Sequence, residues 1–112
     1  MPQKKVIEFE DFLKVDIRIG TVIEAEKVPK SNKLLKLKVN TGVDERLILS
    51  GISKFYSPEE IIDKKVMVLV NLKPRKMMGY ESEGMLLLAE DSDGNLSLMQ
   101  PDSNIGDGSV VA

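Results

Sequence analysis

Two cationic segments hold the residues whose type and spacing could do chemistry. Residues 27–38 contain five Lys, residues 71–80 contain Lys73, Arg75 and Lys76, and all 18 acidic residues lie outside both segments. The net charge of −2 taken alone argues against a nucleic-acid partner. A local cluster of cations nevertheless attracts phosphate groups whatever the total charge is. The separation of cationic from acidic residues along the chain therefore predicts a surface that binds phosphates.

Each segment alone has a simpler interpretation. Lys36 and Lys38 alternate with apolar residues, so both are expected on the solvent face of a strand, where Lys often only solvates the strand and discourages edge pairing. Lys73, Arg75 and Lys76 could belong to a merely soluble loop. The exclusion of acids from both segments at once favours the binding interpretation over these alternatives.

Composition limits the classes of function. The chain has no His and no Cys, which removes the common proton shuttles, thiolate nucleophiles and zinc ligands. Carboxylates and Lys could still catalyse, but no nucleotide-binding loop or pair of nucleophile and base is apparent. We therefore expect no enzyme activity and no cofactor. No apolar run approaches the roughly 18 residues of a membrane span or resembles a signal peptide, so we expect a cytoplasmic protein without membrane contact.

The elements that position the cations are predicted to be short. Residues 8–13 space their apolar side chains as a short helix does, and Ser57 followed by Pro58 and Glu60 predicts the start of a second helix. Gly20 shifts the apolar alternation of the first strand and predicts a bulge at that point. Apolar patterns predict strands over residues 15–23, 35–40, 46–50, 66–70 and 85–89, with a short sixth strand at 96–99.

Three strands, a short helix and two further strands are typical of an OB-fold, an all-β five-stranded Greek-key barrel. The length of 112 residues fits a single domain, residues 1–112, with the residues after 99 as a C-terminal extension. In this barrel the second strand, the loop before it and the loop between strands four and five adjoin. The two cationic segments are then expected to form one surface that follows a phosphate backbone.

Four separated motifs resemble one known family. They are NLKPRKMMG from Asn71, SEGM from Ser82, NKLLKL from Asn32 and SGI from Ser50. Together they resemble the tRNA-binding domain found at the C-terminus of methionyl-tRNA synthetases. The same module is similar to free-standing bacterial tRNA-binding proteins, a yeast synthetase cofactor and the endothelial monocyte-activating polypeptide. The resemblance runs from about Phe9 to the C-terminus.

The resemblance implies a non-catalytic domain or β subunit that binds tRNA by its shape and phosphates and assists the catalytic part of methionyl-tRNA synthetase. It also implies a homodimer with Phe9, Phe12, Ile105 and Val110 at the interface. The expected tRNA-binding residues, of which Lys38 comes from the strand pattern, are Asn32, Lys33, Lys36, Lys38, Asn71, Lys73, Arg75, Lys76, Ser82 and Met85.

An alternative family is the CsaA-like secretion chaperone, a dimer that binds unfolded polypeptide. It resembles the first strand of this chain but lacks the Lys-Pro-Arg-Lys-Met and Ser-Glu-Gly-Met motifs. Its groove is expected to be apolar, whereas the surface predicted here is basic.

Few side chains are available to stack on bases. Beyond the first helix the aromatic residues are Phe55, Tyr56 and Tyr80 only, so phosphate contacts are expected to dominate and binding is expected to be sensitive to salt. Met77 and Met78 are adjacent and cannot both point inward from an extended chain. One of them is expected to face a base or a partner.

Overall fold

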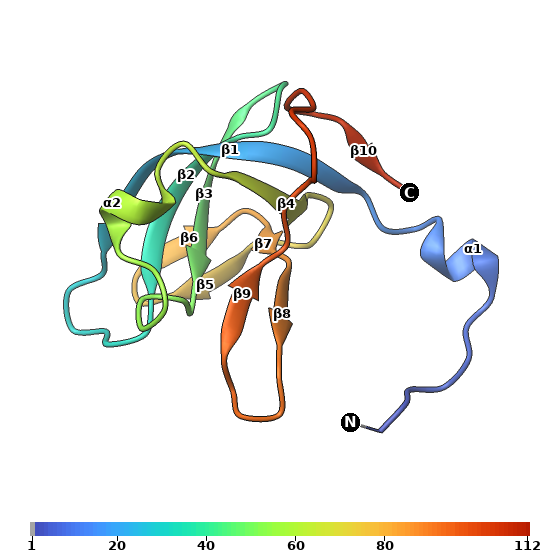
Figure 1. Cartoon of the computed structure of the whole chain (residues 1–112), viewed down its shortest axis with the longest axis horizontal. Helices are drawn as coiled ribbons and strands as arrows, with labels where there is room; N and C mark the ends of the chain where they lie inside the picture. Colours follow the sequence, from blue (N-terminus) through green and yellow to red (C-terminus); the bar gives the residue numbers. More distant parts are fainter. Residues whose placement is uncertain (1) are drawn as a thin grey trace.

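A barrel of antiparallel strands forms the body of the molecule (Figure 1). The fold is that of a computed structural model, which describes residues 2–112. The hydrogen-bonded strands follow the order β3-β2-β1-β4-β7, which confirms the predicted OB-fold. Their bounds are β1 (Ile17–Lys27), β2 (Leu35–Asn40), β3 (Glu45–Ser50), β4 (Lys65–Leu69) and β7 (Met85–Leu86).

Alternate residues of these strands fill the core. Leu35, Leu37 and Val39 of β2 are completely buried, and the residues between them face outward. This alternation follows from the strand geometry, in which successive side chains point to opposite faces. Burying one such aliphatic side chain contributes about 1.5–3 kcal/mol, so the inward face of β2 fixes its register.

The barrel closes between β3 and the residues just before β7. The Glu83 N–H donates to the Leu47 carbonyl at 2.8 Å, and the Glu83 carboxylate accepts from the Leu47 N–H at 2.9 Å. The Ser82 hydroxyl accepts from the Leu49 N–H at 3.0 Å. Two side chains therefore satisfy backbone groups of β3 that would otherwise be unpaired along this edge.

The bend of β1 lies at a different residue from the one predicted. The register between β1 and β2 shifts between Val22 and Glu24, three residues beyond Gly20. A Cβ atom at Gly20 would lie 2.8 Å from the Asn40 carbonyl oxygen. The predicted bulge at Gly20 is therefore wrong: Gly20 is required by the close approach of two strands, and the bulge is at Ile23.

Both predicted helices are present and short. In α2 (Pro58–Ile61) the Ser57 hydroxyl accepts from the Glu60 N–H, and the Glu60 carboxylate accepts from the Ser57 N–H, which confirms the predicted capping box. No residue of α1 (Phe9–Phe12) is buried. Figure 1 shows α1 and the chain before it extending away from the barrel.

A hairpin that was not predicted occupies the second cationic segment. Strands β5 (Arg75–Met77) and β6 (Tyr80–Ser82) pair through a two-residue turn, Met78 and Gly79. Both turn residues have positive φ, 50° and 83°, as tight hairpin turns that match the strand twist require. The segment expected to be a basic loop between the fourth and fifth strands is therefore an ordered hairpin.

The predicted fifth strand is divided in two. Met85 and Leu86 pair with β4, whereas β8 (Leu88–Glu90) pairs with β9 (Leu96–Leu98) in a separate hairpin. The short sixth strand predicted at residues 96–99 corresponds to β9.

The C-terminal extension folds back onto β1. Its last strand, β10 (Val110–Val111), pairs with the start of β1, where the prediction had only an irregular extension. The Asp107 carboxylate accepts hydrogen bonds from the Thr21 hydroxyl at 2.6 Å and from Lys65 Nζ at 2.8 Å. These bonds attach the extension to β1 and β4.

The Asp107 contacts predict a dependence of stability on pH. Burial raises the pKa of the Asp107 carboxyl, but the hydrogen bonds from Lys65 and Thr21 outweigh burial and hold the pKa below the ordinary 3.8. The carboxylate therefore stabilises the fold above pH 3.8, and this contribution is lost as the pH falls through the lowered pKa.

We expect Asp107→Asn to lower the free energy of unfolding by about 1 kcal/mol at neutral pH. The difference from the natural chain should shrink well below pH 3.8, because Asp107 is then protonated as well. Denaturant titrations of the natural chain and of Asp107→Asn, at neutral pH and well below pH 3.8, measure this difference in the free energy of unfolding. An equal difference at both would contradict the role of the carboxylate.

Candidate nucleic-acid interface

The two cationic segments meet at Tyr80. We call residues 27–38 the lysine segment and residues 71–82 the basic hairpin, which extends the second cationic segment by two residues and so includes Glu81, opposite Lys76. Lys36 Nζ of the lysine segment lies 4.5 Å from the centroid of the Tyr80 ring, which begins β6 of the basic hairpin. A cation at this distance is attracted to the face of the ring. The predicted juxtaposition of the two segments is therefore a direct side-chain contact.

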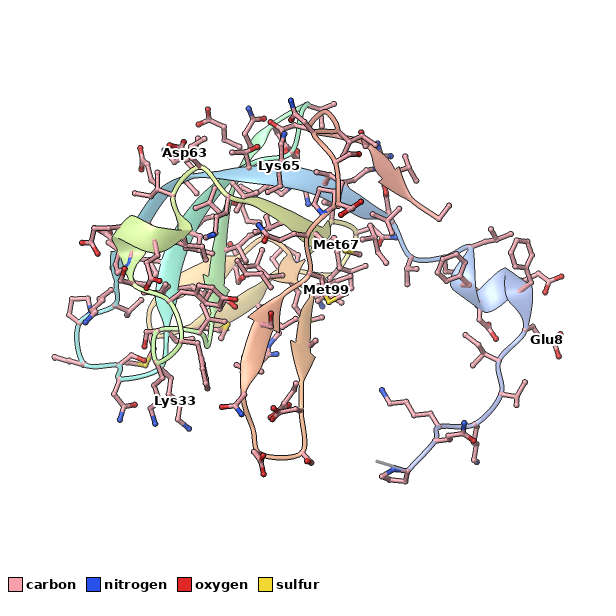
Figure 2. The ribbon with its side chains drawn as sticks, viewed as in Figure 1. Glu8, Lys33, Asp63, Lys65, Met67 and Met99 are labelled. Carbon is pink, nitrogen blue, oxygen red and sulfur yellow. The ribbon has the colours of Figure 1, made fainter. Side chains whose placement is uncertain are left out.

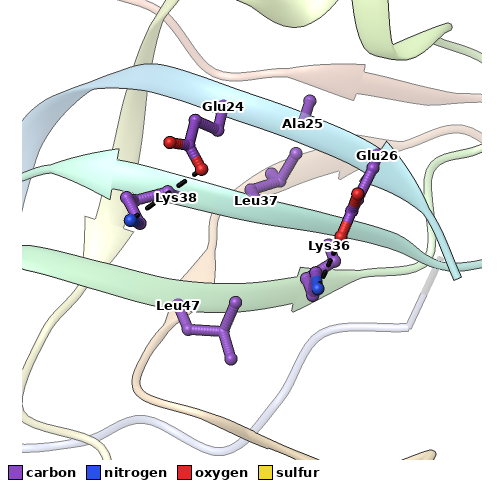
Figure 3. A pocket seen from close by; sticks show the side chains of 7 residues that line it. All are labelled: Glu24, Ala25, Glu26, Lys36, Leu37, Lys38 and Leu47. Atoms are coloured by element: carbon purple, nitrogen blue, oxygen red, sulfur yellow. Dashed lines mark ion pairs between the residues drawn. The ribbon is translucent and has the colours of Figure 1, made fainter.

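The lysines of β2 are paired with acids of β1. Lys36 Nζ lies 2.5 Å from the Glu26 carboxylate and Lys38 Nζ lies 3.8 Å from the Glu24 carboxylate, as Figure 3 shows. The hydrogen bond with Glu26 raises the pKa of Lys36. These four charges largely cancel, because the antiparallel register sets each Lys directly opposite a Glu.

The remaining cations of the two segments are available to a ligand. Lys33, Lys73, Arg75 and Lys76 are exposed, and within residues 2–112 none of them has a carboxylate oxygen within 4.0 Å. Figure 2 shows Lys33 at the outer edge of the barrel. Lys27 and Lys30 are likewise exposed and have no ion pair among residues 2–112. A cation without an ion pair contacts a phosphate without first breaking one, so these six side chains carry the accessible positive charge.

The loop that presents Asn32 and Lys33 is held by backbone contacts. The Ser53 hydroxyl donates to the Asn32 carbonyl at 3.0 Å, and the Ser53 N–H donates to the Lys33 carbonyl at 2.9 Å. The side chains of Asn32 and Lys33 are exposed. Their positions are therefore fixed by the backbone while the side chains face solvent.

Asn71 has a structural contact in addition to its predicted binding role. Its side-chain oxygen accepts from the Asp16 N–H at 2.9 Å, and its side-chain nitrogen donates to the Lys14 carbonyl at 2.6 Å. Asn71 thus joins the first residue of the basic hairpin to the chain between α1 and β1.

The other end of the basic hairpin is held at β3. Ser82 is buried, and its hydroxyl donates to the Gly84 carbonyl at 3.0 Å while it accepts from Leu49. The Arg46 guanidinium donates to the carbonyl of Val70 at 2.5 Å and to that of Glu83 at 3.1 Å, the residues that flank the hairpin. Arg46 was not identified from the sequence, where it is one outward residue of an ordinary strand.

Met85 lies at a hollow beside the basic hairpin. Its side chain is 42% exposed although it belongs to β7 of the barrel. The hollow has a volume of about 230 Å³, and Lys73, Arg75, Ser82 and Met85 are among the residues that line it. Five of the predicted binding residues thus lie at or near this region, because Lys76 follows Arg75 on β5.

The four residues predicted for self-association are exposed in the single chain. The exposed fraction is 70% for Phe9, 39% for Phe12, 43% for Ile105 and 63% for Val110. Because β10 pairs with Ile17, and α1 precedes that residue closely in the chain, the helix and the C-terminal strand lie at the same end of β1 (Figure 1).

Neither a metal centre nor a membrane span is found among residues 2–112. No three acidic side chains in this part of the chain are placed to hold a metal ion. No helix there is long and apolar enough to cross a membrane.

Comparison with known proteins gives one family match. A family model described as a putative tRNA-binding domain matches residues 17–110. The chain is 56% identical over 110 residues to a methionine–tRNA ligase of Flavobacterium johnsoniae and 53% identical over 110 residues to one of Porphyromonas gingivalis. Each match covers 98% of this chain, which spans only 16% of the length of either ligase.

Solved structures share the same fold. A MetRS-related protein from Pyrococcus horikoshii has a TM-score of 0.92 and 39% identity, and the match covers 97% of this chain and all of that one. The chaperone CsaA from Bacillus anthracis has a TM-score of 0.88 and 31% identity over 96% of this chain and all of its own. With the family model extending over most of the barrel, the chain belongs to the family of tRNA-binding domains.

Proposed function

We propose that this chain is a non-catalytic module that binds tRNA through its phosphate backbone and shape. The observation that carries the proposal is the group of exposed cations without an ion pair among residues 2–112, which includes Lys33, Lys73, Arg75 and Lys76, on two segments joined by the contact of Lys36 with Tyr80. Cations spaced along one face suit a polyanion better than a small ligand. Contacts of this kind position RNA without reading its sequence.

The module serves methionyl-tRNA synthetase in this proposal. The methionine–tRNA ligases that it resembles are much longer, and the chain corresponds to 16% of their length. We infer that residues 1–112 form a single domain, either the C-terminal domain or a separate β subunit of such an enzyme, which acts in the cytoplasm during protein biosynthesis. Its role is to raise the affinity of the catalytic part for tRNA, since a second linked site increases the effective concentration of the ligand.

A second candidate function is that of a chaperone for unfolded polypeptide. The likeness to CsaA of Bacillus anthracis favours it, because that match covers the whole of the chaperone chain at 31% identity. The identity to methionine–tRNA ligases is higher, at 56%, and the free cations suit a polyanion. Binding of a denatured, uncharged polypeptide in preference to tRNA would support the chaperone function instead.

We further propose that two copies associate through α1 and β10. Phe9 and Phe12 of α1 expose aromatic rings, and Val110 exposes an aliphatic side chain at the same end of β1. Ile105 is also exposed, in the extension that leads to β10. Apolar side chains gathered in this way expose surface whose burial against a second copy is favourable.

The affinity for tRNA is expected to depend steeply on salt. One phosphate contact each by Lys33, Lys73, Arg75 and Lys76 predicts that the logarithm of the association constant falls against the logarithm of the salt concentration with a slope of about −3 to −4. Titration of tRNA at several salt concentrations measures the slope. An affinity that does not change with salt would rule out the phosphate contacts.

Removing a positive charge from this surface should weaken tRNA binding, and removing a negative charge should strengthen it. We expect Arg75→Glu to weaken tRNA binding by about tenfold, or about 1.4 kcal/mol. Glu26→Gln should strengthen it by about two- to fivefold, because it releases Lys36 from an exposed ion pair worth about 0.2–1 kcal/mol. Equilibrium binding and thermal melting of each variant provide the measurements.

Lys5→Glu is the matched control for the charge reversal. Lys5 is exposed and lies in the chain before α1, which extends away from the barrel. The Lys5→Glu variant should leave the affinity for tRNA nearly unchanged, although it alters the net charge by the same amount as Arg75→Glu. If Arg75→Glu lowers the melting temperature of the protein as well as its affinity for tRNA, Arg75 has a structural role instead.

Phe12→Asp is expected to convert the dimer to a monomer. A charge buried at an apolar interface without a partner costs several kcal/mol, which is enough to dissociate a dimer of ordinary affinity. Sedimentation velocity measures the change. Phe55→Asp is the control, because Phe55 has nearly the same exposure, 38% against 39%, and precedes α2. A dimer that survives Phe12→Asp would place the interface elsewhere.

A further inference from the structure

The hollow beside the basic hairpin combines apolar walls with two cations. It lies against β3 on one side and β7 and β8 on the other, and Lys73 and Arg75 also line it. Its apolar lining consists of Leu49, Leu72, Met77, Met85, Leu86 and Leu88. The electrostatic surface described above accounts for Lys73 and Arg75 but gives no reason for the apolar walls between them and the barrel.

The walls are partly exposed to solvent. Leu49 and Leu86 are buried and form the floor, whereas Leu72 is 39% and Met85 is 42% exposed. Large apolar side chains around a concave site favour an occupant with an apolar face, since covering them removes that surface from water. Met77 and Met85 suit a flat occupant in particular, because a thioether is polarisable and adapts its shape to an aromatic ring.

The size of the hollow limits the occupant. Its volume of about 230 Å³ is below the range of about 300–1,000 Å³ typical of sites for drug-sized molecules. A single aromatic base is therefore a better match than a larger ligand. The two cations at the same site favour an occupant that also carries negative charge, and a nucleotide with its phosphates meets both conditions.

Building on the proposed tRNA-binding function, we propose that this hollow receives one unpaired base of the bound tRNA, with the adjoining phosphates on Lys73 and Arg75. Folded RNA presents unpaired bases in its loops and ends, and proteins bind such bases by packing against their faces. The Ser82 hydroxyl already donates to Gly84 and accepts from Leu49. The Ser82 hydroxyl therefore does not supply a free hydrogen-bond donor to the base.

The contact can be separated from phosphate binding by comparing two RNAs. The probes are tRNA and a fully paired RNA duplex of similar length, which offers phosphates but no unpaired base. We expect Met85→Ala and Leu72→Ala each to weaken tRNA binding by about fivefold or more while duplex binding changes little, since packing against a base is lost. Melting temperatures confirm that both variants remain folded.

Met99→Ala is the matched control. Met99 is 41% exposed, nearly the same as Met85, follows β9 and does not line the hollow. It should bind both RNAs as the natural chain does. If Met85→Ala and Leu72→Ala also bind tRNA as the natural chain does, or weaken binding of tRNA and duplex equally, the base site is excluded and the tRNA-binding function stands.

Two other results would have different meanings. If the natural chain fails to bind tRNA at all, the proposed function itself is wrong, and the base site with it. If a denatured polypeptide competes with tRNA and Met85→Ala weakens the binding of that polypeptide, the hollow holds an apolar side chain and the base site is overturned.

Discussion

Side-chain hydrogen bonds at the edge of β3 hold the barrel closed and fix the basic hairpin against it. Ser82 and Glu83 accept from backbone N–H groups of β3, and Arg46 bridges the carbonyls of Val70 and Glu83 on either side of the hairpin. A buried N–H without a partner costs about 1–3 kcal/mol, so this edge must be satisfied for the barrel to close. The same bonds set the base of the hairpin. The same hydrogen bonds therefore close the barrel and position the cations of the hairpin.

Fewer lysines on this surface are free of ion pairs than its Lys content suggests. Lys36 and Lys38 lie beside the other cations but are paired with Glu26 and Glu24 (Figure 3). Lys36 also contacts Tyr80 and so joins β2 to the hairpin. A chain with a net charge of −2 can bind a polyanion in this arrangement, because the two cationic segments meet at the contact of Lys36 with Tyr80 and hold exposed cations that have no ion pair among residues 2–112.

Local patterns predicted the elements whose structure depends on residues that are close together in the sequence. The capping box at Ser57 and the alternation of β2 both appear in the structure, and the order of strands predicted the OB-fold. Features that depend on contacts between distant segments could not be predicted. The pairing of Lys36 with Glu26 depends on the register of β1 against β2. The hydrogen bonds of Asp16 with Asn71 and of Leu49 with Ser82 join residues 55 and 33 positions apart. The hairpin at Met78 and Gly79 was missed because Met rarely adopts a positive φ.

We propose that the exposed cations of both segments contact one tRNA together. Chemical acetylation of the lysines with and without tRNA, read residue by residue by mass spectrometry, tests this contact. Lys33, Lys73 and Lys76 are expected to lose reactivity together, at the same tRNA concentration, while Lys5 and Lys64, which lies between α2 and β4, keep theirs. Protection of only one segment, or protection of Lys5 and Lys64 without the others, would contradict it.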